Sequence, residues 1–147
     1  MKRHLLQVVL LMMLFLSCKN NLDSASSKTA MKAHVEQLNP EVEELVKNWD
    51  GYWALKRNIA MIENTNPLNA IEFMDKLAHN CNAMIIQIPQ ELKKPEIKEQ
   101  INKVDSRINE FYSEVNRNEI RERVVENHIE TIVNAFDTLN KELNSIL

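Results

Sequence analysis

Apolar residues recur at alternating intervals of three and four along most of this chain of 147 residues. That spacing places the members of the set on one face of an α-helix. No alternating apolar–polar run, which would predict a half-buried strand, competes with it. The chain is therefore predicted to be all-α. The set from position 42 onward, called here the apolar seam, consists of Val42, Leu45, Trp49, Tyr52, Ile59, Ile71, Met74, Ala78, Cys81, Ile85, Ile88, Ile97, Ile101, Val104, Ile108, Phe111, Val115, Val125, Ile129, Ile132, Phe136, Leu139, Leu143 and Ile146.

Four prolines divide this pattern into segments. Proline suits the first position of a helix and disrupts an interior one, and asparagine is a common N-cap. The signals Asn39-Pro40 and Asn66-Pro67 therefore predict two helix starts, each with its asparagine as the cap. The helices predicted from these signals cover residues 40–64, 67–88 and 95–115.

A fourth helix is predicted to follow Asn118, which is its expected cap, and to run to the C-terminus. A further helical pattern precedes the first proline. It starts near Met31 and includes Val35 and Leu38 at heptad spacing. Gly51, the single glycine, is predicted to be tolerated inside the first long helix, where glycine costs about 1 kcal/mol relative to alanine.

Additional apolar residues flank the seam. A two-stranded coiled coil needs only a narrow seam, so the extra residues require contact on more than one side of each helix. Short connections favour antiparallel neighbours. An up-down antiparallel helical bundle, of four helices, is therefore predicted. The flanking residues are Val46, Trp53, Leu55, Ile62, Leu77, Met84, Tyr112 and Val133.

The N-terminal end carries a different pattern. Lys2 and Arg3 precede Leu5–Leu16, which is apolar except for Gln7. A run of about 12 residues suits the apolar region of a secretory signal, whereas a membrane-spanning helix needs about 20. Residues 1–17 are therefore predicted to be a signal peptide that is removed.

The end of this signal, Phe15-Leu16-Ser17-Cys18, resembles the lipobox of bacterial lipoproteins, in which a small residue precedes the modified cysteine. The resemblance covers residues 1–18. Ser17 and Cys18 match the motif, and Phe15 stands where leucine is usual. The resemblance implies that a diacylglycerol is attached to the Cys18 sulfur and that cleavage leaves Cys18 as the acylated first residue, anchored in a membrane. Ordinary signal-peptidase cleavage is the alternative.

Lys19 follows the cysteine. In enterobacterial lipoproteins the absence of aspartate at this position goes with sorting to the outer membrane. The resemblance therefore implies an exported protein on the outer membrane, facing the periplasm, with the cell surface as the alternative. The polar, serine-rich composition of residues 18–30 predicts a flexible tether, and residues 31–147 are the predicted helical-bundle domain.

Charge and cysteine content restrict the function further. Removal of Lys2 and Arg3 leaves 16 basic residues against 21 acidic ones, so the net charge falls from −3 to −5. A mildly acidic surface argues against nucleic-acid binding. With Cys18 lipidated, Cys81 has no intramolecular disulfide partner. Its place in the seam predicts a buried, inert thiol, and a reactive or intermolecular thiol is the alternative.

A helical bundle raises the question of a metal or haem site. The di-iron pattern needs Glu-x-x-His on facing helices, and no histidine of this chain has a glutamate three residues before it. Asp75 and His79 lie four residues apart and could share a cation, but His79 is predicted to lie on an outward face. His128 is predicted to be a boundary histidine. Haem ligation would require Met74 or Met84 opposite His128, but methionine in a core ordinarily fills space. No cofactor or metal ion is therefore predicted.

Catalytic signals are also weak. Cys81 and His79 are the nucleophile and base closest in sequence, but residues two apart on a helix point away from each other. The sequence has no glycine-rich phosphate loop. We therefore predict that the protein is not an enzyme.

Trp49, Tyr52 and Trp53 form the densest aromatic cluster. A packed aromatic layer is the first interpretation, and an exposed Trp53 would be the candidate anchor for a protein partner. Together these features favour a lipid-anchored envelope protein that binds another envelope protein or stabilises an assembly. The alternative is a periplasmic bundle that binds a ligand, a metal or haem.

Overall fold

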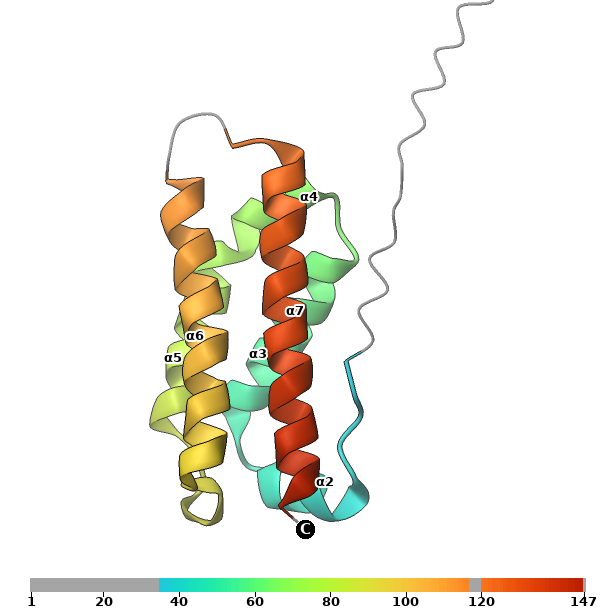
Figure 1. Ribbon diagram of the computed structural model, residues 1–147, viewed down its shortest axis with the longest axis vertical. Coiled ribbons are helices and arrows are strands. Elements are labelled where there is room, and N and C mark those ends of the chain that lie inside the picture. Colours follow the sequence, from blue (N-terminus) through green and yellow to red (C-terminus); the bar gives the residue numbers. More distant parts are fainter. Residues whose placement is uncertain (1–34, 117–119, 147) are drawn as a thin grey trace, which may run out of the picture. The chain divides into compact units, whose positions relative to one another are not determined.

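The structure is a computed structural model that describes residues 35–116 and 120–146. All regular structure in these ranges is helical, as predicted (Figure 1). The described helices belong to one compact unit, Met31–Leu147. They are α2 (Pro40–Val46), α3 (Asp50–Glu63), α4 (Pro67–Ala70), the 3₁₀ turn η1 (Ile71–Phe73), α5 (Met74–Ile86), the 3₁₀ turn η2 (Gln90–Leu92), α6 (Pro95–Val115) and α7 (Glu122–Ser145).

The longer helices α3, α5, α6 and α7 pack around a shared apolar core. Helix α6 lies against α7, α5 lies against both α3 and α6, and α3 and α4 contact α7. Figure 1 shows α6 and α7 side by side and running in opposite directions. The core therefore draws apolar side chains from every long helix, and removal of this surface from water is the main force that stabilises the domain.

Helices α6 and α7 follow the predicted pattern. Helix α6 begins at Pro95 and ends at Val115, and its interior seam residues are buried. The seam residues of α7 are buried as far as Leu143. Tyr112, predicted to flank the core, is exposed, because the adjacent Phe111 fills the inward position of that turn. Helix α7 begins at Glu122, and Asn118, its predicted cap, lies outside the described residues.

The first predicted long helix is broken. Helix α2 ends at Val46 and α3 begins at Asp50, so the prediction of one helix continuing through Gly51 is wrong. The Trp49 N–H donates to the Val46 carbonyl at 2.9 Å and closes the turn between the two helices. The indole N–H of Trp53 donates to the same carbonyl at 2.9 Å. The turn thus satisfies an acceptor that the end of α2 leaves open.

This break changes which residues face the core. Val42, Val46 and Trp49 are fully buried, whereas Leu45, predicted to lie in the seam, is 36% exposed. The turn after Val46 starts a new helix in a new orientation, so a single heptad pattern does not extend across it. As a consequence, α3 is only 14 residues long.

Gly51 lies in the first turn of α3, where the backbones of α3 and α5 come into close contact. A Cβ atom on Gly51 would lie 2.3 Å from the Met84 backbone nitrogen and 2.5 Å from the Ala83 carbonyl carbon. The Gly51 N–H also donates to Gln87 Oε1 at 3.1 Å. Gly51 is therefore a point of backbone contact between two helices and not the tolerated weak point that was predicted.

The second predicted helix contains the 3₁₀ turn η1 between α4 and α5. Asn66 caps α4 as predicted, since its Oδ1 accepts from the Leu68 N–H at 3.0 Å. The buried stripe differs from the predicted seam, because α5 packs between α3 and α6 and buries a wider face. Ile71, Ala78, Ile85 and Ile88 of the seam are only partly buried. The buried set is Ala70, Met74, Leu77, Cys81 and Met84.

Residues Val35–Asn39, called here the strap, form no helix, so the helical prediction is wrong for this segment. Asn39 has an extended backbone (φ −64°, ψ 148°), as expected for a residue that precedes proline. It occupies the N-cap position of α2, but its side chain does not cap the helix. Its N–H donates instead to Asn144 Oδ1 of α7 at 2.8 Å. Figure 1 shows the strap alongside the C-terminal half of α7.

Candidate functional site

The strap is bound to α7 by polar side chains three and four residues apart. The Glu36 N–H donates to Asp137 Oδ1 at 2.7 Å, and Asn140 Nδ2 donates to the Glu36 carbonyl at 2.6 Å. Asn144 Nδ2 donates to the Gln37 carbonyl and to Glu36 Oε1, both at 2.9 Å. Residues at these intervals lie on one face of a helix. The strap and α7 therefore run in the same direction along a line of polar contacts.

Asn140 connects this line of contacts to the core. It is fully buried, and its Oδ1 accepts from the Tyr52 hydroxyl at 2.9 Å. Burial, partly offset by this hydrogen bond, raises the pKa of the Tyr52 hydroxyl above its ordinary value of 10. The hydroxyl therefore stays protonated and acts as a donor throughout the physiological pH range.

We expect Tyr52→Phe to lower the free energy of unfolding by about 1–2 kcal/mol, because it leaves the buried Asn140 Oδ1 without its donor. Urea unfolding followed by circular dichroism measures this change. Tyr112→Phe is the matched control, since the Tyr112 side chain is 40% exposed. Equal stability of the two variants would contradict a structural role for the Tyr52 hydroxyl.

The aromatic cluster forms a packed layer. The rings of Trp49 and Tyr52 stack with centroids 5.4 Å apart, and Tyr52 also stacks on Phe136 at 5.4 Å. Trp53 meets the Tyr52 ring edge-on at 5.2 Å. Such pairs add to the stabilisation that comes from burial alone. The layer joins α3 to α7 through Tyr52 and Phe136, and the Tyr52 hydroxyl connects it to Asn140, which binds the strap.

Trp53 is the member of the cluster that reaches the surface, where it is half-buried. Its indole N–H is occupied by the Val46 carbonyl. The Lys56 ammonium lies 5.0 Å from the centre of the Trp53 ring, a cation–π geometry. A partner that binds Trp53 would therefore meet an aromatic edge and a lysine. Its role in partner binding stays a prediction.

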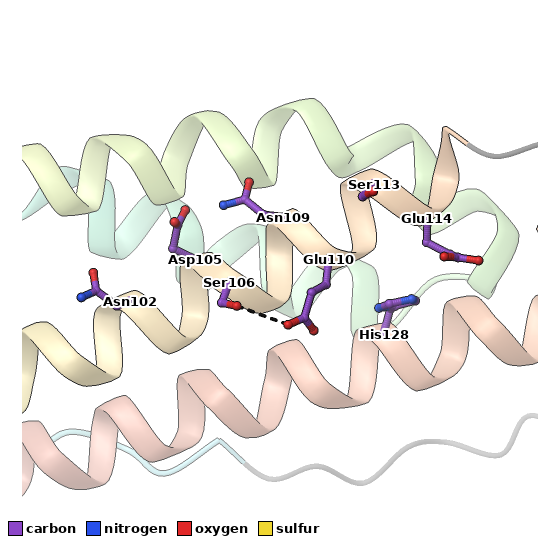
Figure 2. A pocket seen from close by; sticks show the side chains of 8 residues that line it. All are labelled: Asn102, Asp105, Ser106, Asn109, Glu110, Ser113, Glu114 and His128. Atoms are coloured by element: carbon purple, nitrogen blue, oxygen red, sulfur yellow. Dashed lines mark hydrogen bonds between the residues drawn. The ribbon is translucent and has the colours of Figure 1, made fainter.

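An open polar depression follows the outer face of α6 (Figure 2). Glu110 is bonded to two side chains of the same helix. Ser106 Oγ donates to Glu110 Oε1 at 3.2 Å, and Arg107 Nη1 donates to Glu110 Oε2 at 2.7 Å. The hydrogen bond from Arg107 holds the pKa of Glu110 below its ordinary value. The depression is lined by Asn102, Asp105, Ser106, Asn109, Glu110, Ser113, Glu114 and His128.

His128 is the contribution of α7 to this depression. Its ring stacks on Phe111 with centroids 5.1 Å apart and an interplanar angle of 12°. Figure 2 shows the imidazole beside Glu110 and Glu114. His128 therefore lies at the boundary of the core, as predicted, with the aromatic face of α6 as its support. The α6 carboxylates beside His128 were not predicted, because their proximity depends on how α6 packs against α7.

Cys81 is buried in α5, as predicted. Its Sγ donates to Asp105 Oδ1 of α6 at 3.7 Å. Burial, with a smaller contribution from the Asp105 carboxylate, raises the pKa of the thiol from 9.0 to about 12. Since the thiolate is the nucleophilic form, the folded protein holds Cys81 in its unreactive state at neutral pH.

This raised pKa predicts a loss of stability at alkaline pH. The thiol ionises near pH 9 in the unfolded chain and near pH 12 in the folded one. The contribution of the protonated thiol to the free energy of unfolding is therefore complete below pH 9 and is lost as the pH rises towards 12. Between pH 7 and pH 10 we expect the wild type to lose about 1.4 kcal/mol more than Cys81→Ala. Urea unfolding at both pH values measures the difference. Parallel losses in the two proteins would contradict the raised pKa.

The remaining predicted positions are spread over the fold. His79 and Asp75 are exposed on α5, whereas Met74 and Met84 of the same helix are buried in the core. Within residues 35–116 and 120–146, no three His, Cys, Asp or Glu side chains lie close enough together to hold a metal ion. In the same ranges no helix has the length and apolarity needed to span a membrane. Cys18 lies outside the described residues.

Comparison with known proteins gives no relative for this chain: no protein-family model, curated protein or solved structure matches it.

Proposed function

We propose that the chain is a lipid-anchored protein of the cell envelope whose helical bundle binds another envelope protein or stabilises an assembly. The proposal rests on the N-terminal sequence, in which two basic residues are followed by the apolar run Leu5–Leu16 and then by Ser17-Cys18. This arrangement resembles the signal of a bacterial lipoprotein. Under this proposal Cys18 carries the lipid and attaches the chain to the outer membrane, facing the periplasm. More than one buried acyl chain gives stable attachment.

The first described residues of the domain support an anchored role. Chain termini are usually poorly ordered unless other residues hold them. Here the strap is hydrogen-bonded to Asp137, Asn140 and Asn144 of α7. Asn140 is in turn bonded to Tyr52 of α3. A tether that enters through the strap is therefore attached to two core helices.

The contacts among the helices support the predicted up-down four-helix bundle as the architecture. Its helices would be α3, α5, α6 and α7, with α2 and α4 as short additional helices. Each helix of this set contacts the next one along the chain, and the first helix, α3, also contacts the last, α7. These contacts support the four-helix arrangement. Short connections favour antiparallel packing in such a set.

The anchor is tested by Cys18→Ala in cells supplied with a labelled fatty acid. We expect the variant to lose the acyl label and to leave the membrane fraction, because the thiol is the attachment point. Cys81→Ala is the matched control and should keep both properties, since that thiol is buried. Acyl label that survives in Cys18→Ala would contradict the proposal.

A further inference from the structure

The face of α7 that holds the strap contacts mainly the main chain. Asp137 accepts from the Glu36 N–H, Asn140 donates to the Glu36 carbonyl, and Asn144 pairs with the Gln37 carbonyl and the Asn39 N–H. Main-chain donors and acceptors are present in every polypeptide. This arrangement therefore recognises an extended backbone, as the exposed edge of a sheet does in other peptide-binding proteins.

Two of the three side chains are held in place by residues outside the strap. The Tyr52 hydroxyl donates to Asn140 Oδ1 at 2.9 Å, which directs the Asn140 amide nitrogen to the strap. Lys141 Nζ lies 2.7 Å from Asp137 Oδ2, while Asp137 Oδ1 accepts from the strap. The site is thus organised before an extended segment binds. With the strap bound Asn140 is fully buried, and its amide nitrogen loses its carbonyl acceptor when the strap leaves, which favours the binding of another carbonyl there.

Two side chains of the strap add selectivity. Glu36 Oε1 accepts from Asn144 Nδ2 at 2.9 Å, and the positive charge of Lys141 attracts the same carboxylate. Leu38 is 5% exposed and belongs to the core cluster. The preferred ligand is therefore an extended segment with an acidic residue two positions before a large aliphatic one.

We propose that the Asp137–Asn140–Asn144 face of α7 is a binding site for an extended segment of a partner protein with this acidic-x-aliphatic pattern, and that the strap is its intramolecular occupant. The inference deepens the proposed interaction role and rests on it for the existence of a partner. The strap can be exchanged because it belongs to no helix and because the Glu36 N–H and carbonyl, the Gln37 carbonyl and the Asn39 N–H all bond to side chains of α7. The Asn39 carbonyl, at the junction with α2, accepts instead from the Glu43 N–H. When the strap opens, Leu38 leaves the core together with Val35, which is partly buried against the core cluster.

The test uses the full chain in detergent and a fluorescent peptide with the sequence of residues 34–41. Fluorescence anisotropy measures peptide binding to the wild type and to Glu36→Ala/Leu38→Ala, which weakens the strap and leaves α7 unchanged. The apparent Kd depends on the fraction of open sites, so we expect the variant to bind the peptide about 10-fold more tightly than the wild type. Adding Asn144→Leu to the variant should abolish this gain.

Recognition of the main chain is tested by a peptide methylated on the Glu36 nitrogen, which removes the N–H that Asp137 accepts. We expect it to bind about 10-fold more weakly than the unmodified peptide, while a scrambled peptide does not bind. Should Leu38→Ala prevent folding, as judged by circular dichroism, Glu36→Ala alone serves as the weakened strap, since Glu36 is only partly buried.

Several results would overturn the inference. One is that the peptide binds the wild type and the weakened variant with the same affinity. Another is that adding Asn144→Leu to the weakened variant leaves peptide binding unchanged. A third is that the methylated peptide binds as tightly as the unmodified one. If the wild type is a dimer and the free peptide dissociates it, the strap on each α7 face comes from a second copy. That result would overturn the assignment of the strap as an intramolecular occupant. These measurements need no membrane, so they can fail while the Cys18 anchor stands, and the anchor can fail while they succeed.

Discussion

Replacing Gly51 with alanine should destabilise the domain by about 3 kcal/mol, the upper end of the usual cost of overpacking. The new Cβ would lie 2.3 Å from the Met84 backbone nitrogen. Backbone atoms of a packed helix cannot move aside as the end of a flexible side chain can. Helices α3 and α5 must therefore separate, which also lengthens the 2.8 Å bond from the Trp49 indole to the Met84 carbonyl.

Whether Gly51→Ala stabilises or destabilises the domain distinguishes close backbone contact from helix propensity alone. Helix propensity alone predicts that glycine to alanine inside a helix stabilises by about 1 kcal/mol. The matched control is Ala60→Gly on the exposed face of α3, where propensity alone should cost about 1 kcal/mol. Chemical unfolding monitored by circular dichroism measures both. A more stable Gly51→Ala protein would show that the two backbones are not in close contact.

Replacing Ile132 with aspartate should leave the domain unfolded at room temperature. Ile132 is fully buried in α7, among apolar side chains of the core cluster. An unpaired buried charge costs several kcal/mol, on top of the lost apolar burial, and domains of this size are stable by only about 5–15 kcal/mol. Ile101→Asp on α6, where the isoleucine is 3% exposed, should behave in the same way.

The control for this prediction is Asn134→Asp, which places the same charge on the exposed face of α7. It should change the free energy of unfolding by about 0.5 kcal/mol or less. Far-ultraviolet circular dichroism and the melting temperature distinguish the two variants. A folded Ile132→Asp protein with the wild-type melting temperature would contradict the core assignment of α7.

Helices α6 and α7 were predictable because local signals and packing agree there. Pro95 marks the start of α6, and its inward positions repeat at intervals of three and four without interruption up to Phe111. Each helix also lies against a long neighbour, so one apolar stripe accounts for most of its burial. In such helices the heptad pattern is sufficient to identify the core.

The break between α2 and α3 and the extended strap were not predictable in this way. Both depend on partners that are distant in the sequence. Trp49 donates its indole N–H to Met84, 35 positions away, and this bond fixes the chain direction after α2. The strap is extended because residues near position 140 bind its backbone. The apolar spacing that includes Val35 and Leu38 favours helix, and tertiary contacts override it.

At the candidate sites, too, properties that depend on one helix were predictable, and contacts between distant segments were not. The burial of Cys81 followed from its apolar neighbours on one helix, but the contact of its thiol with Asp105 requires the packing of α5 on α6. The position of Trp53 at the edge of the core followed from the heptad, but its hydrogen bond to the Val46 carbonyl requires the turn that the sequence did not indicate. The Asp137–Asn140–Asn144 face was missed because polar residues on a helix are ordinarily solvated surface.

The position of the strap also determines the order in which the domain is completed. Its hydrogen-bond partners on α7 lie 101 to 108 residues further along the chain. A ribosome synthesises the strap before α7, so the α7 partners of the strap are missing during almost the whole of synthesis of the domain. Closing a loop of this length costs chain entropy, and contacts between distant residues form slowly. The part of the domain that is made first is therefore among the last to reach its native position, and a nascent chain that stops before Asp137 offers it no partner on α7.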